Sequence, residues 1–75
     1  MNYMFEIVVK RDFNAGGYKI PAGLSIHMAH DQVSNPLCSM YGKQRIAQAL
    51  LMQYGVDLSH NMNYINTSYM DAYRM

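Results

Sequence analysis

One segment of the 75-residue chain has the period of an amphipathic helix, and it constrains the fold more than any other feature. Within residues 39–54, apolar side chains recur at spacings of three and four along one stripe: Ile46, Ala47, Leu50, Leu51 and Tyr54. Gly55 can take the left-handed conformation that ends a helix, and Val56 can then fold back onto Leu51. The pattern predicts one helix that ends at Tyr54, and its start is either brought forward by Pro36 or delayed by Gly42.

The first thirty residues instead alternate with the period of two that is typical of β-strands. Residues 3–13 place their aromatic and branched side chains on one face, which predicts a strand. Residues 14–17 form a turn, because glycine accepts a positive φ at low cost, and "YKI" is a brief strand. Pro21 and Gly23 fit a three-residue hairpin loop with a glycine bulge, so residues 24–29 are predicted to return beside "YKI".

The C-terminal third is predicted to contain a loop and one more strand. Residues 56–63 read as a loop, and residues 64–75 as a strand with partly apolar side chains on both faces. Together these elements predict a single α+β domain over residues 1–75. Its small antiparallel sheet, in the chain order strand, strand, strand, helix, strand, packs on one amphipathic helix.

The apolar composition raises the question of what covers the second face of such a sheet. Half of the residues are hydrophobic and only 15% are charged, against roughly 25% in a typical soluble domain. Cys38 is the only cysteine, so no disulfide can form within the chain. One helix covers one face, so we expect apolar side chains of the last strand to bind a second copy of the chain or another protein: Tyr64, Tyr69, Met70 and Tyr73. The alternative is that methionine and tyrosine fill a small, irregular core.

A protein-interaction module, forming a homodimer, is therefore the predicted function, and a nucleic-acid-binding accessory protein is the alternative. The alternative requires that the six cations gather around stacking tyrosines: Lys10, Arg11, Lys19, Lys43, Arg45 and Arg74. A formal net charge of +1 and the scattered positions of these residues do not favour it.

Two histidines in "SIHMAH" suggest a metal site, but their spacing argues against one. Side chains change face at every residue of a strand, so His27 and His30 point to opposite sides of the sheet. Possible further ligands, Asp31, Cys38 and His60, lack the paired spacing of zinc sites. We predict ordinary strand histidines, with capping of the strand end as a further role for His30, and no metal or other cofactor.

The residue types needed for catalysis are present, but no motif arranges them. Cys38 lies beside the predicted helix start, where the helix dipole favours a thiolate, although a half-buried structural cysteine is the preferred interpretation. Glu6 is the only glutamate, and the aspartates lie mostly in turns and loops. We expect a non-enzymatic protein.

Localisation is predicted from the apolar segments. No basic stretch precedes the short apolar run near the N-terminus, and no segment approaches the roughly 20 apolar residues that cross a bilayer. These features predict a cytoplasmic protein that does not enter a membrane.

Four short motifs carry a resemblance to known sequences: "KRDF" (10–13), "SNPL" (34–37), "YGVDL" (54–58) and "NTSYMD" (66–71). With them, nearly the whole chain resembles a family of short, functionally uncharacterised proteins from gut anaerobes, some of them carried on mobile elements. The resemblance implies a standalone domain of about this length. It provides no activity and no binding residues.

Overall fold

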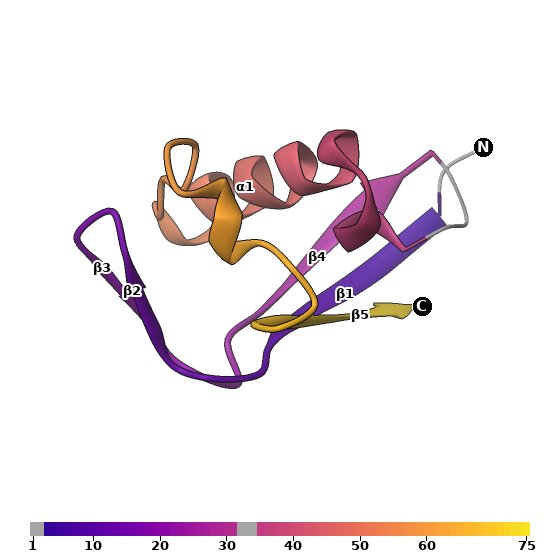
Figure 1. Ribbon diagram of the computed structural model, residues 1–75. Coiled ribbons are helices and arrows are strands. Elements are labelled where there is room, and N and C mark those ends of the chain that lie inside the picture. The colour runs from indigo at the N-terminus through magenta and orange to yellow at the C-terminus, as the bar shows by residue number, and fades with distance from the viewer. Residues whose placement is uncertain (1–2, 32–34) are drawn as a thin grey trace.

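The computed structural model describes residues 3–31 and 35–75, and the domain has the predicted α+β class (Figure 1). The described residues form five strands, one α-helix and two short 3₁₀ helices: β1 (Tyr3–Val9), β2 (Phe13–Ala15), β3 (Tyr18–Ile20), β4 (Ser25–His30), η1 (Pro36–Cys38), α1 (Met40–Tyr54), η2 (Met62–Tyr64) and β5 (Met70–Arg74). In the part of the chain that is described, no helix is long and apolar enough to cross a membrane.

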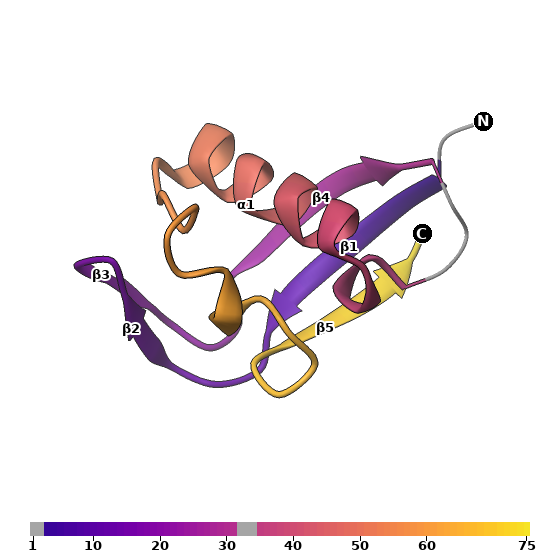
Figure 2. The same ribbon diagram turned by 45° about the horizontal axis from the view of Figure 1, so that its top comes forward.

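The main sheet has three antiparallel strands in the order β4-β1-β5 (Figure 2). The central strand β1 buries Phe5, Ile7 and Val9 on the face that α1 covers, because alternate side chains point to the same side. Within that layer, α1 packs mainly on β4, while η1 lies next to β5. No helix formed by the described residues lies over the opposite face of the sheet (Figure 1).

The predicted hairpin between "YKI" and the following strand is wrong, since β3 pairs with β2 and β4 pairs with β1. The predicted strand over residues 3–13 is likewise broken at residues 10–12. Residues 10–12 form a bend beside the Pro21–Gly23 turn. Asp12 Oδ1 accepts a hydrogen bond from the Ala22 amide of that turn at 2.6 Å. The bend separates the main ladder from the β2–β3 arm, which turns away from the sheet (Figure 1). The predicted turn at the arm's tip is confirmed, with left-handed φ at both Gly16 and Gly17.

Helix α1 begins and ends close to the predicted residues. The Ser39 hydroxyl caps it by accepting a hydrogen bond from the Gly42 amide at 3.0 Å. At the other end Gly55 has a φ of 72° and donates to the Leu51 carbonyl at 2.9 Å. Pro36 opens the separate helix η1 rather than α1, and Gly42 does not delay the start of α1.

The core differs from the predicted helix stripe in two positions. Ile46 and Leu50 are buried against the sheet as predicted, but Leu51 is 47% exposed and Tyr54 is also exposed. The side of α1 that faces the sheet is narrow, and Leu51 lies about 100° around the helix from Leu50. In compensation, Leu58 from the predicted loop is fully buried, at 0% exposure.

The last strand is shorter than predicted and begins at Met70 rather than at residue 64. Residues 62–64 form η2, and a turn centred on Asn66 follows. The Asn66 carbonyl accepts from the Met70 amide at 2.9 Å, and its side-chain oxygen accepts from the Ser68 amide at 2.7 Å. An asparagine that binds neighbouring backbone groups favours a turn over an extended strand.

The two strand histidines point to opposite faces, as predicted. His27 lies on the open face, where its Nε2 is 3.5 Å from Glu6 Oε2. His30 is buried against Phe5, with ring centroids 5.9 Å apart and near-perpendicular ring planes. Among the described residues, neither ring nitrogen of His30 has a hydrogen-bond partner. The nearest carboxylate oxygen, Asp31 Oδ1, is 3.9 Å from His30 Nδ1, beyond hydrogen-bond distance. The buried ring therefore carries a desolvation cost that no hydrogen bond among the described residues offsets.

We expect His30→Leu to raise the free energy of unfolding by about 1–2 kcal/mol, because it removes two buried polar atoms without partners. Urea denaturation followed by circular dichroism measures the change. His27→Leu, at an exposed position of the same strand, is the control and should change stability by less than about 0.5 kcal/mol. A loss of stability in His30→Leu would show that the imidazole is bonded after all.

Candidate functional site

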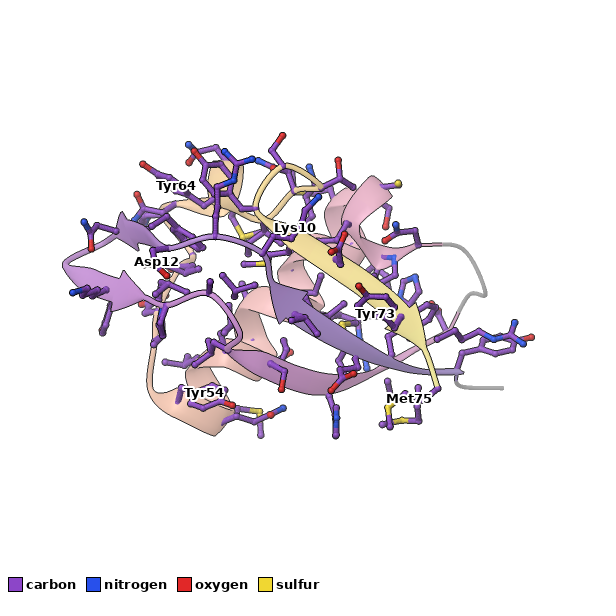
Figure 3. All side chains as sticks on the ribbon, turned by 90° about the horizontal axis from the view of Figure 1, so that it is seen from below. Lys10, Asp12, Tyr54, Tyr64, Tyr73 and Met75 are labelled. Carbon is purple, nitrogen blue, oxygen red and sulfur yellow. The ribbon has the colours of Figure 1, made fainter. Side chains whose placement is uncertain are left out.

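The open face of the main sheet carries charged and polar side chains beside apolar ones, which corrects the expectation of a surface made chiefly of tyrosine and methionine (Figure 3). Glu6 lies between its cross-strand neighbours His27 and Tyr73. Lys10 Nζ is 3.5 Å from Asp71 Oδ1 on the same face. These groups are solvated by water and need no second subunit to cover them.

One corner of this face is apolar. Tyr73 is 54% exposed and Met75 is 67% exposed, and both lie at the end of β5 (Figure 3). The Met75 amide donates to the Met4 carbonyl at 2.9 Å, so exposed Met4 lies beside them on β1. The most exposed apolar side chains of the open face are therefore gathered where β1 begins and β5 ends.

The four residues predicted to bind a partner do not form one surface. Tyr73 is at the exposed corner, whereas Met70 is buried in the core and is not accessible. Tyr64 and Tyr69 instead pack with Phe13, with ring centroids 5.1–5.2 Å apart. This aromatic cluster joins the β2–β3 arm to the segment before β5, so the two tyrosines have a structural role.

A groove lies along the outer side of α1, between the helix and the loop of residues 57–62. Its volume is about 370 Å³, and eight residues line it: Met40, Gln44, Ala47, Gln48, Leu51, Asp57, Ser59 and Met62. Three of the apolar side chains in it come from α1, at spacings of seven and four, and Met62 faces them from η2. Met40 and Leu51 are both exposed to solvent.

Asp57 gives the rim of the groove a negative charge. Hydrogen bonds from the side chain and the backbone amide of Ser59 lower the pKa of the Asp57 carboxyl below its usual value. The carboxylate is therefore ionised at neutral pH. A partner with a cation beside an apolar stretch would complement this rim.

The six cations proposed for nucleic-acid binding are distributed over several elements. Lys10 is paired with Asp71, and three arginines lie over tyrosine rings: Arg11 on Tyr69, Arg45 on Tyr41 and Arg74 on Tyr3, at 5.6–5.7 Å. Lys19 is on the arm and Lys43 is on α1. This dispersion does not favour a continuous phosphate-binding track.

Possible metal ligands and nucleophiles are also dispersed. Within the described residues, no group of three histidine, cysteine or acidic side chains is placed to hold a metal ion. Cys38 lies in η1 and is exposed, which corrects the expectation of a half-buried structural cysteine.

The sequence alone did not predict this groove, because Leu51 was expected to pack against the sheet with the rest of the apolar stripe. A signal for it exists in the sequence, since Met40 lies seven residues before Ala47 and widens the predicted stripe on the side of Ala47 and Leu51. Met62 could not be connected with this stripe, because its position depends on how the loop of residues 57–62 folds back.

In the comparison with known proteins, the chain matches a family model described as a family of unknown function (DUF6140) over residues 1–72. No curated protein and no solved structure matches the chain. The family match confirms the predicted resemblance to a short, functionally uncharacterised domain. The origin in gut anaerobes stays a prediction.

Proposed function

The chain belongs to a family of unknown function, DUF6140, and we propose that it is a non-catalytic protein-interaction module. Its binding site in this proposal is the groove beside α1, and the ligand is an apolar helical segment of another protein. The observation that carries the proposal is the exposure of Met40 and Leu51 in a concave site that Met62 closes from the other side.

The chemistry of the groove suits an amphipathic helix. Such helices insert apolar side chains spaced by three or four residues into grooves of this kind. Methionine is unbranched and flexible, so Met40 and Met62 can adapt their shape to a bound side chain. Asp57 at the rim favours a lysine or arginine next to the apolar stripe of the partner.

The proposed setting is the cytoplasm. The exposed thiol of Cys38 supports this, because free exposed cysteines are most stable in a reducing compartment.

Selection of displayed helical peptides tests the proposal. We expect selection on the folded domain to enrich amphipathic peptides that carry a cation. Their affinity should fall at least about tenfold for Leu51→Lys, because that change places a charge in the apolar groove. Asp57→Asn should weaken binding less, since it removes only the charge at the rim.

Met52→Lys is the matched control, because Met52 is on the same helix and exposed but does not line the groove. It should leave the affinity unchanged. Selected peptides that bind Leu51→Lys as tightly as the wild type, or a failure to enrich any amphipathic sequence, would contradict the proposal.

A further inference from the structure

The two edges of the main sheet differ in how their outward backbone groups are satisfied. Just before β4, the Leu24 carbonyl accepts from the Val9 amide of β1, so alternation directs the backbone groups of Ser25, His27 and Ala29 away from the sheet. Side chains of α1 donate to all three outward carbonyls: Tyr54 to Ser25 at 2.6 Å, Gln53 to His27 at 2.8 Å, and Arg45 to Ala29 at 3.0 Å. The helix thus occupies the edge of β4, which protects it from pairing with another strand.

The edge of β5 is different. At its two ends the Tyr69 carbonyl accepts from the Lys10 amide and the Met75 amide donates to the Met4 carbonyl, so alternation directs the backbone groups of Ala72 and Arg74 away from the sheet. Across residues 3–31 and 35–75, no hydrogen bond engages these outward groups. Ala72 is half-buried and Arg74 is exposed. This short stretch of β5 is the open edge of the sheet.

We propose that β5 pairs antiparallel with β5 of a second copy of the chain, with Tyr73 on the two-fold axis. In this register Ala72 lies opposite Arg74 of the other copy, and each pair exchanges N–H···O=C bonds through the groups that are otherwise free. This inference goes beyond the proposed function and uses a different surface. It makes the two main sheets continuous and leaves both grooves open.

The register of the proposed β5–β5 pairing follows from which backbone groups of β5 are accessible. A pairing centred on Ala72 would need the backbone of Met70, which is buried and whose amide already donates to Asn66. Centring on Tyr73 uses only Ala72 and Arg74. Both are already extended, so the pairing needs little ordering of the chain.

The side chains at the edge are compatible with this pairing. The two Tyr73 rings meet as a cross-strand aromatic pair on the open face, and the exposed apolar corner that includes Met75 becomes partly covered. Arg74 is held over the ring of Tyr3, at 5.6 Å, which directs its charge back toward β1. Asp71 is paired with Lys10 within its own chain.

Disulfide trapping tests the register. In a Cys38→Ser background, we expect Tyr73→Cys to form an interchain disulfide under mild oxidation. Residues directly opposite in a non-hydrogen-bonded pair have Cα atoms about 4.5 Å apart, which suits a disulfide. Asp71→Cys on the same face is the control. Its two copies would be separated by about 14 Å along the strands, so it should crosslink at least about tenfold more slowly.

A second variant guards against trapping by random collision. Ala72→Pro, added to the Tyr73→Cys chain, removes an N–H that no hydrogen bond among the described residues uses. It should abolish crosslinking while circular dichroism shows that the fold is retained. Equal crosslinking rates for Tyr73→Cys and Asp71→Cys, or no crosslink in either, would overturn the proposal. Leu51→Lys should leave the rate unchanged, which separates this test from that of the groove.

Discussion

Leu58→Ala is expected to lower the free energy of unfolding by about 2–5 kcal/mol, although Leu58 lies in a stretch without regular secondary structure. The Leu58 side chain is fully buried in the core cluster, so its truncation removes apolar contacts and leaves a cavity. A domain of this size has only a few kcal/mol of net stability to lose. The variant should therefore be largely unfolded or shifted to a much lower urea midpoint.

Leu51→Ala is the matched control, because the same atoms are removed from a side chain that is 47% exposed. We expect it to change the free energy of unfolding by less than about 1 kcal/mol. Urea titrations of both variants, with equal slopes, give the comparison. If Leu51→Ala were the more destabilising variant, α1 would face the sheet with the stripe that the sequence alone predicted.

Gly42→Ala is expected to destabilise the domain by about 2–3 kcal/mol, opposite to the usual effect of alanine in a helix. Alanine normally stabilises a helix by about 1 kcal/mol relative to glycine. Here a Cβ atom at Gly42 would lie 2.1 Å from the Pro36 carbonyl oxygen. Helix η1 packs directly on this turn of α1, so the backbone of Pro36 would have to move, and overpacking of this kind costs stability.

Gln44→Ala provides the control for helix propensity, because Gln44 is exposed and lies two residues after Gly42, about 200° around the helix from the contact with η1. It should change stability by less than about 0.5 kcal/mol. Thermal and urea unfolding both measure the difference. A Gly42→Ala variant that is more stable than the wild type would mean that η1 does not pack against this turn.

The features that depend only on neighbouring residues were predicted correctly from the sequence. The αL glycine at residue 55 ends α1 as predicted, and Gly16 and Gly17 form the tip of the arm. The opposite orientation of His27 and His30 followed from strand alternation alone. The α+β class followed from having one helix in a chain of alternating segments.

The predictions that failed depend on long-range packing. Pro21 and Gly23 do form a turn, but whether β3 pairs with β2 or with β4 depends on the bend that Asp12 stabilises across the chain. Tyr64 was predicted to be in a strand because residues 64–75 were interpreted as one extended segment with side chains on two faces. The turn at Asn66 and the stacking of Tyr64 on Phe13 override that pattern.

The candidate groove also depends on tertiary packing. Residues 57–62 approach α1 because Leu58 and Ile65 are buried in the core, which brings Met62 opposite Leu51. Nothing local in "VDLSHNMN" indicates that approach. The exposed edge of β5 could not be predicted from the sequence either. It depends on the strand order and on the side chains of α1 that occupy the edge of β4.

Mapping a selected peptide by amide chemical shifts tests most directly whether the groove beside α1 is the binding site. On titrating the ¹⁵N-labelled domain, we expect the largest shifts at groove residues of α1 and of the 57–62 loop: Met40, Gln44, Leu51, Ser59 and Met62. The open face of the sheet, represented by Glu6 and His27, should not respond. Shifts centred on Glu6 and His27, with the groove unaffected, would contradict the proposed function.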